Sequence, residues 1–178
     1  MSRFNRPAAG RVRGLGFSPV GILDDGRVAL ELTIAGRMGL AAVLGFLIGL
    51  ERESRGKSAG ERTFAIVALG AAGFAGTAIS IFPETAGQAV AGVATGIGFL
   101  GVGIIWRAEE GETRGLTTAA SILCVAALGV VTGIGLYLTA ILGTGLALFI
   151  LEFDRMPGLR GLHRRVTGRP DMDDEDQS

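Results

Sequence analysis

Five apolar stretches of about 16–19 residues follow one another between Leu32 and Leu151, and the charged residues lie almost entirely in the gaps between them. A helix of about 20 residues, rising 1.5 Å per residue, crosses the roughly 30 Å hydrocarbon layer of a bilayer. Of the 34 charged residues, 14 lie in this region, and only Arg37 falls inside an apolar stretch. A soluble amphipathic helix would instead repeat charge with a period near 3.6 residues. The chain is therefore predicted to be an integral membrane protein.

The predicted fold is all-α, a polytopic transmembrane helical bundle of about five spans with glycine-rich helix interfaces. The spans are expected at 32–50, 64–82, 89–106, 116–131 and 134–151. Pro83 ends the second span, and the segment Thr132-Gly133-Ile134-Gly135 divides an uncharged stretch that is too long for one span. One tilted span with a re-entrant segment is the alternative for that stretch. Residues 1–31 are expected to form a polar, flexible arm, and residues 152–178 a basic and then acidic tail that is disordered at its end.

Lysine and arginine predict the orientation, because cytoplasmic loops carry an excess of both. Eleven of them lie in residues 51–63, residues 107–115 and the proximal tail, whereas the opposite side has only Arg13 and Arg27 close to a span. The C-terminus is therefore expected in the cytoplasm and the N-terminus outside. Three further arginines in the N-terminal arm oppose this orientation and would favour four spans with the N-terminus inside.

Glycine is abundant, at 30 residues, and much of it lies inside the apolar stretches. GxxxG spacing lets neighbouring helix backbones approach closely in a membrane. The predicted helix-packing glycines are Gly45, Gly49, Gly92, Gly96, Gly98, Gly101, Gly103, Gly129 and Gly133. The cluster from Gly96 to Gly103 has a second interpretation, a broken helix that turns its carbonyls toward a cavity, as in some transporters.

The loop 51–63 holds seven charged residues directly at the predicted membrane surface. One interpretation is a solubilising loop that only sets orientation. The other is that Glu51, at the end of the first span, pairs with Arg62 or Arg114 and holds helix ends in register, since arginine binds carboxylates through two parallel N–H groups.

The segment from Arg114 to Ser121 is typical of a helix start. Thr117 or Thr118 is expected to cap the fourth span, and Ser121 and Cys124 follow on the same helix. Capping and small-residue packing is one account, with Cys124 as a small buried side chain. The other is a hydroxyl-lined stripe that receives an anion at the positive end of the helix.

Residue types that are absent from the spans limit the function. None of the predicted spans contains Asp, Glu, Lys or His, and Arg37 is expected to extend its side chain toward the membrane surface. Ion-coupled carriers usually need such an intramembrane group. We therefore expect no catalytic residue, no metal site and no cofactor, and the zero net charge gives no indication of nucleic-acid binding.

Several motifs then occur in an order that resembles the N-terminal membrane domain of the MgtC/SapB family. They are GLERE at 49–53 with AGERT at 59–63, VALGA at 67–71, TGIGFLGVGI at 95–104, RGLTTAAS at 114–121 and the segment from Ala126 to Tyr137. The candidate functional residues in and beside these motifs are Glu51, Arg52, Arg62, Thr63, Arg114, Thr117, Thr118, Ser121 and Cys124.

At four positions the residue differs from the one that the family pattern leads us to expect. Phe64 replaces a histidine, Gln88 an arginine, Gly92 a glutamine and Leu123 a tryptophan. Only a short tail follows the last span, so the chain resembles the short, SapB-like branch rather than the longer members with an added cytoplasmic domain.

The resemblance implies a protein of the bacterial inner membrane that is linked to survival at low magnesium, and for some members restraint of the F-type ATP synthase. The first functional hypothesis is a non-enzymatic regulator that binds other membrane proteins, or a second copy in a homo-oligomer, through glycine-lined helix faces. The second is a small transporter or channel for an unidentified solute. A vestibule at Gly96–Gly103 would favour the second, and a solid bundle with an exposed glycine face the first.

Overall fold

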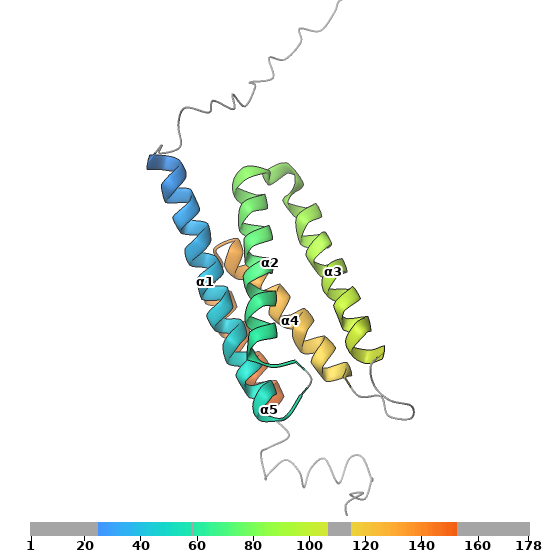
Figure 1. Cartoon of the computed structure of the whole chain (residues 1–178). Coiled ribbons are helices and arrows are strands. Elements are labelled where there is room, and N and C mark those ends of the chain that lie inside the picture. The colour runs from blue at the N-terminus through green and yellow to red at the C-terminus, as the bar shows by residue number, and fades with distance from the viewer. Residues whose placement is uncertain (1–24, 58, 107–114, 153–178) are drawn as a thin grey trace, which may run out of the picture.

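The computed structural model describes residues 25–57, 59–106 and 115–152, which form five helices and one short 3-10 helix (Figure 1). This confirms the all-α bundle, and the described ranges contain no strand. The elements are α1 (Asp25–Ser54), α2 (Glu61–Ile81), η1 (Pro83–Thr85), α3 (Ala86–Trp106), α4 (Leu116–Gly133) and α5 (Tyr137–Glu152).

The helix ends differ from the predicted span ends because polar residues extend a helix beyond the hydrocarbon layer. α1 begins at Asp25, so residues 25–31, predicted as part of a flexible arm, are helical. Asp25 in the first turn favours this start, since a carboxylate is stabilised near a helix N-terminus. α2 ends at Ile81, two residues before Pro83, as predicted. The arm before Asp25 and the tail after Glu152 lie outside the described residues.

Four helices are long and apolar enough to cross a membrane, namely α1, α2, α4 and the helix that includes α3. The fifth, α5, has 16 residues and is about 24 Å long at 1.5 Å per residue. Large apolar side chains cover the outside of the bundle, with Phe99 79% exposed and Leu138 71% exposed. Such a surface is typical of a protein whose outer shell faces lipid.

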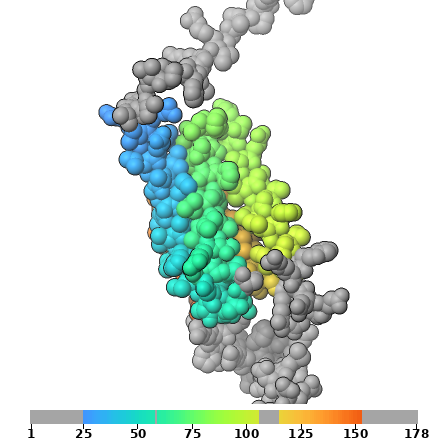
Figure 2. All heavy atoms as spheres, viewed as in Figure 1, coloured from blue at the N-terminus to red at the C-terminus, as the bar shows by residue number. Residues whose placement is uncertain are grey.

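α2 lies at the centre of the bundle. It packs most extensively against α1 and next against α4, while α5 contacts α1 and α4 (Figure 1). Figure 2 shows α1 and α2 in continuous contact along the bundle, with α3 at its edge. The core consists mostly of small and medium side chains around the fully buried Phe64, and these include Ile48, Ala68, Ile122 and Val125.

The turn between α4 and α5 lies at the predicted position, and Gly135 adopts a left-handed φ of +95° there. Arg37 of α1 binds this turn: its Nη1 donates to the carbonyl oxygen of Gly133 at 2.9 Å and its Nε to the hydroxyl of Tyr137 at 3.1 Å. The expectation that Arg37 extends toward the membrane surface stays a prediction. Its guanidinium satisfies a carbonyl at the C-terminal end of α4, where a positive charge is favourable.

Four of the predicted packing glycines do bring helix backbones together. A Cβ added at Gly45 would lie 2.6 Å from the carbonyl oxygen of Phe64, and one at Gly49 would lie 2.5 Å from the Cα of Glu61. Added Cβ atoms at Gly129 and Gly133 would each lie 2.4 Å from a carbonyl oxygen of α2. These contacts leave no room for a side chain, so α1 and α4 both meet α2 backbone to backbone.

The glycines of α3 behave differently. An added Cβ at Gly92, Gly96, Gly98 or Gly103 meets nothing within 4 Å, and one at Gly101 makes only an ordinary contact with Ala119 at 3.5 Å. The prediction of close packing within the bundle is therefore wrong for the first four. Gly92, Gly96 and Gly103 share one face of α3, but that face is not turned toward another described helix of the chain.

Candidate functional site

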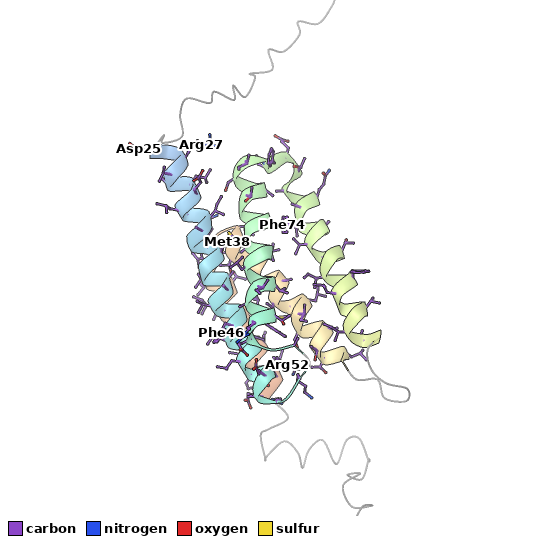
Figure 3. All side chains as sticks on the ribbon, viewed as in Figure 1. Asp25, Arg27, Met38, Phe46, Arg52 and Phe74 are labelled. Atoms are coloured by element: carbon purple, nitrogen blue, oxygen red, sulfur yellow. The ribbon has the colours of Figure 1, made fainter. Side chains whose placement is uncertain are left out.

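The most buried charged side chain among the described residues belongs to Arg52, in the last turn of α1, where 2% of the residue is exposed. It lies at the opposite end of α1 from Asp25 and Arg27 (Figure 3). Its Nη2 donates to the hydroxyl of Thr118 at 3.3 Å. Thr118 is also buried and lies in the first turn of α4. Residues from two motifs that are 66 positions apart therefore meet at one point, which joins α1 to α4.

A chain of charges beside Arg52 joins α1 to α5. Glu51, whose side chain is 7% exposed, forms an ion pair with Arg55 one helical turn later. The Nη2 of Arg55 also lies 3.3 Å from a carboxylate oxygen of Glu152, near the end of α5. Side chains four residues apart lie on the same face of a helix, which accounts for the first pair.

The predicted pairing of Glu51 with Arg62 is wrong. The side chain of Arg62 is 93% exposed, and its Nε is 4.0 Å from the carboxylate of the adjacent Glu61. Arg62 begins α2 on the solvent side, whereas Arg55 follows Glu51 on its own helix. The second predicted partner, Arg114, lies outside the described residues.

The connection between α1 and α2 is ordered by a carboxylate. Oε2 of Glu53 accepts a hydrogen bond from the backbone amide of Glu61 at 3.2 Å, which satisfies one free N–H group at the start of α2. Gly56 takes a left-handed φ of +62° in this connection. Thr63 is exposed on α2. Glu53 thus joins the end of α1 to the start of α2.

The start of α4 differs from the prediction that Thr117 or Thr118 caps it. The N-cap residue is Gly115, with φ +99°, and it makes no side-chain capping bond. Ser121 donates to the carbonyl oxygen of Thr117 at 2.6 Å and is buried, while Thr117 itself is exposed. The side of α4 that faces the bundle therefore runs through Thr118 and Ser121.

Cys124 is exposed on α4, so its interpretation as a small buried side chain is wrong. The stripe expected from Thr117 through Ser121 to Cys124 does not face the bundle as a unit, because only Ser121 of the three is buried. Helix rotation by one residue places Thr118, rather than Thr117, on the packed side.

Several buried polar atoms at this end of the bundle have no hydrogen-bond partner within the described part of the chain. They are both carboxylate oxygens of Glu51, Nε of Arg52, Nη2 of Arg55 and Oε2 of Glu61. The Glu51–Arg55 and Arg55–Glu152 contacts are thus close approaches of opposite charge without aligned hydrogen bonds. No group of three or more His, Cys, Asp or Glu side chains in residues 25–57, 59–106 and 115–152 is placed to hold a metal ion. The site offers N–H donors and carboxylates for non-covalent binding.

Sequence reasoning identified Glu51, Arg52 and Thr118 but missed two of their neighbours. The spacing of four residues between Glu51 and Arg55 was a usable signal for that ion pair. No sequence signal indicated the contact of Glu152 with Arg55, because that contact depends on how α5 packs along α1. Arg37 and Tyr137 are 100 residues apart, and their contact depends on where the α4–α5 turn lies along α1.

Comparison with known proteins identifies the family. The profile described as the MgtC family matches residues 38–156. The chain is 45% identical over 104 residues to Protein MgtC of Salmonella typhimurium (strain LT2), which covers 58% of this chain and 45% of that protein. It is 45% identical over 105 residues to Protein MgtC of Brucella abortus (strain 2308), covering 58% and 44%.

The chain thus spans less than half the length of these MgtC relatives. It is 36% identical over 169 residues to Protein SrpB of Synechococcus elongatus, covering 82% of this chain and 93% of that protein. No solved structure matches the chain significantly. The match to the family profile includes the second half of α1 and the whole of α4, whose motifs meet at Arg52 and Thr118. This chain belongs to the MgtC family of membrane proteins.

Proposed function

We propose that this chain is a non-enzymatic inner-membrane regulator, linked to magnesium homeostasis, that binds a helix of another membrane protein through the outer face of α3. The observation that carries the proposal is the open glycine face of α3. Gly92, Gly96 and Gly103 have nothing within 4 Å of an added Cβ, in contrast to the glycines that contact α2.

The three glycines lie on one side of the helix. At 100° per residue they fall within about 40° of arc, and Gly101, which contacts Ala119 of α4, lies on the opposite side. Ile97 and Ile104 pack against the core from that inner side. Gly92, Gly96 and Gly103 therefore point away from the rest of the bundle.

A glycine face suits a partner helix in a membrane. Lipid tails are as apolar as leucine, so helices associate through close backbone packing rather than through burial of apolar area. Phe99 lies between Gly96 and Gly103 on the same face and is 79% exposed, which supplies a large side chain for a partner to surround. The partner that the family resemblance implies is the F-type ATP synthase.

The test compares leucine substitutions on α3 with a matched one elsewhere. Gly96→Leu and Gly103→Leu fill the proposed face, while Gly145→Leu fills an equally open position on α5. Each variant is expressed in a bacterial strain that lacks its own copy. ATP-driven proton pumping is then measured in inverted membrane vesicles, together with co-purification of ATP synthase subunits and growth at low magnesium.

The wild type and Gly145→Leu are expected to lower proton pumping and to retain the synthase, whereas the two α3 variants lose both effects with unchanged thermal unfolding. Retention of the synthase by Gly96→Leu and Gly103→Leu would overturn the proposal. If the face instead pairs two copies of the chain, the same variants will halve the mass of the purified protein in detergent without affecting the synthase.

A further inference from the structure

Arg52 carries a positive charge in a place that water barely reaches, and it forms no ion pair with a carboxylate of the described residues. Within residues 25–57, 59–106 and 115–152, no carboxylate oxygen lies within 4.0 Å of its side-chain nitrogens. The adjacent Glu51 is paired with Arg55, which is in turn shared with Glu152. A buried charge without a direct ion pair is costly, because it has lost its hydration without gaining a close partner.

The guanidinium also retains free donors. Nε of Arg52 is buried without a hydrogen-bond partner, and the bond from Nη2 to Thr118 uses one of the two hydrogens on that nitrogen. Arginine presents parallel N–H groups along an edge of its planar head, a geometry that matches two oxygens of a carboxylate or phosphate.

A second positive element converges on the same point. Thr118 lies in the first turn of α4, where the backbone amides of Leu116, Thr117 and Thr118 have no acceptor within the helix. Gly115 provides no side-chain cap for them. Helix N-termini attract anions, and a guanidinium placed there is repelled by the helix dipole unless an anion lies between them.

We propose that Arg52, Thr118 and the first turn of α4 form a binding site for a phosphate-class oxyanion at the basic end of the bundle. The anion accepts from Nε and a terminal nitrogen of Arg52 on one side and from the free amides of α4 on the other. Its negative charge neutralises both the guanidinium and the helix end. Because the site lies at a membrane surface, the phosphate belongs either to a lipid head group or to a free anion.

The first measurement is a titration of the purified full-length protein in a neutral detergent with inorganic phosphate, at an ionic strength held constant with sodium chloride. Phosphate is expected to raise the midpoint of thermal unfolding, since a ligand that binds only the folded state stabilises it. Arg52→Gln is expected to raise the apparent Kd at least about tenfold, and Thr118→Val, which releases the guanidinium from its position, about two- to tenfold.

Arg62→Gln is the matched control, because it removes an exposed arginine at the same end of the bundle and is expected to leave the Kd within about twofold. Arg52→Lys covers the case in which Arg52→Gln does not fold: it keeps the charge but loses the paired donors, so it weakens phosphate binding as well. Gly96→Leu keeps the phosphate response, which separates this site from the proposed α3 face.

The second measurement repeats the titration with dihexanoylphosphatidic acid, a soluble lipid with a phosphate head group. Saturation at a concentration at least about tenfold lower than that of inorganic phosphate assigns the site to a lipid; equal or weaker binding assigns it to the free anion. No phosphate-dependent shift in the wild type, as expected if another carboxylate of the chain neutralises Arg52, overturns the proposal. An equal loss of binding in Arg62→Gln and Arg52→Gln overturns it too.

Discussion

At the scale of single residues, two arginines of α1 hold the ends of α4. Arg52 contacts the first turn of α4 through Thr118, and Arg37 contacts its last carbonyl at Gly133. The two contacts are 15 residues apart on both helices, which run antiparallel. At 1.5 Å per residue they are about 22 Å apart, so they fix the register of α1 against α4 over most of a membrane span.

Arg37→Leu is expected to lower the free energy of unfolding by about 2–3 kcal/mol, because it leaves the carbonyl of the buried Gly133 without its charged donor. Tyr137→Phe removes only a neutral acceptor and is expected to cost about 0.5–1.5 kcal/mol. Unfolding by titration with sodium dodecyl sulfate in mixed micelles measures both. Arg27→Leu, at the exposed start of α1, is the control. Equal losses for Arg37→Leu and Arg27→Leu would show that the α4–α5 turn does not depend on Arg37.

Charges at helix ends were predictable from the sequence, but their pairing was only partly so. The position of Glu51 and Arg52 after an apolar stretch placed both at the membrane surface. Burial of Arg52 rather than Arg62 depends on which side of each helix faces α4, and a rotation of 100° per residue decides this. Sequence spacing gives that rotation within a helix but not between helices.

At the scale of helices, α2 is the element on which the bundle is built. The glycines of α1 meet α2 at Glu61, Phe64 and Ala68, and those of α4 meet it at Ala68, Ala71 and Ala72. Apolar stretch lengths and Pro83 predicted the existence of all five helices. GxxxG spacing occurs at 45/49, 92/96 and 129/133, and only the structure shows which of these glycine pairs contact another helix.

Substitution by alanine should therefore have opposite effects at two glycines. Gly129→Ala is expected to destabilise the fold by about 1–3 kcal/mol or more, because the new Cβ would lie 2.4 Å from the carbonyl oxygen of Ala68. Gly98→Ala places its Cβ in open space and is expected to be neutral or stabilising by up to about 1 kcal/mol, since alanine favours a helix over glycine. Thermal unfolding of the two variants beside the wild type makes the comparison. A loss at Gly98 as large as that at Gly129 would refute the open space beside Gly98.

At the scale of the whole molecule, the two ends of the bundle differ in charge. The connection after α1, the start of α4 and the end of α5 lie at one end, and Asp25 and η1 lie at the other (Figure 1). The excess of lysine and arginine at the first end predicts that it faces the cytoplasm. The odd number of helices then places Asp25 on the outside.

Single-cysteine labelling tests this orientation. Cys124 is the one cysteine of the chain, so Cys124→Ala gives a background without thiols. In that background, Lys57→Cys is expected to react with an impermeant maleimide only from the cytoplasmic side, and Thr85→Cys only from outside. Asp25→Cys should label together with Thr85→Cys, which checks that α1 crosses the membrane once. Labelling of Lys57→Cys from outside would reverse the topology.

The backbone contacts of α2 also have a mechanical consequence. Helices that touch through long side chains can slide past one another as those side chains change rotamer, which is the basis of shear motion in proteins. Glycine against a carbonyl oxygen has no rotamer to change, so α1, α2 and α4 are expected to move as one rigid body. The remaining freedom is expected in α3 and α5, because α3 buries only Gly101 within residues 86–105 and α5 buries only Ala140 and Thr144. A change at the charged end of the bundle would thus be transmitted along the rigid unit, and its mechanical output would be a displacement of α3 or α5 within the bilayer.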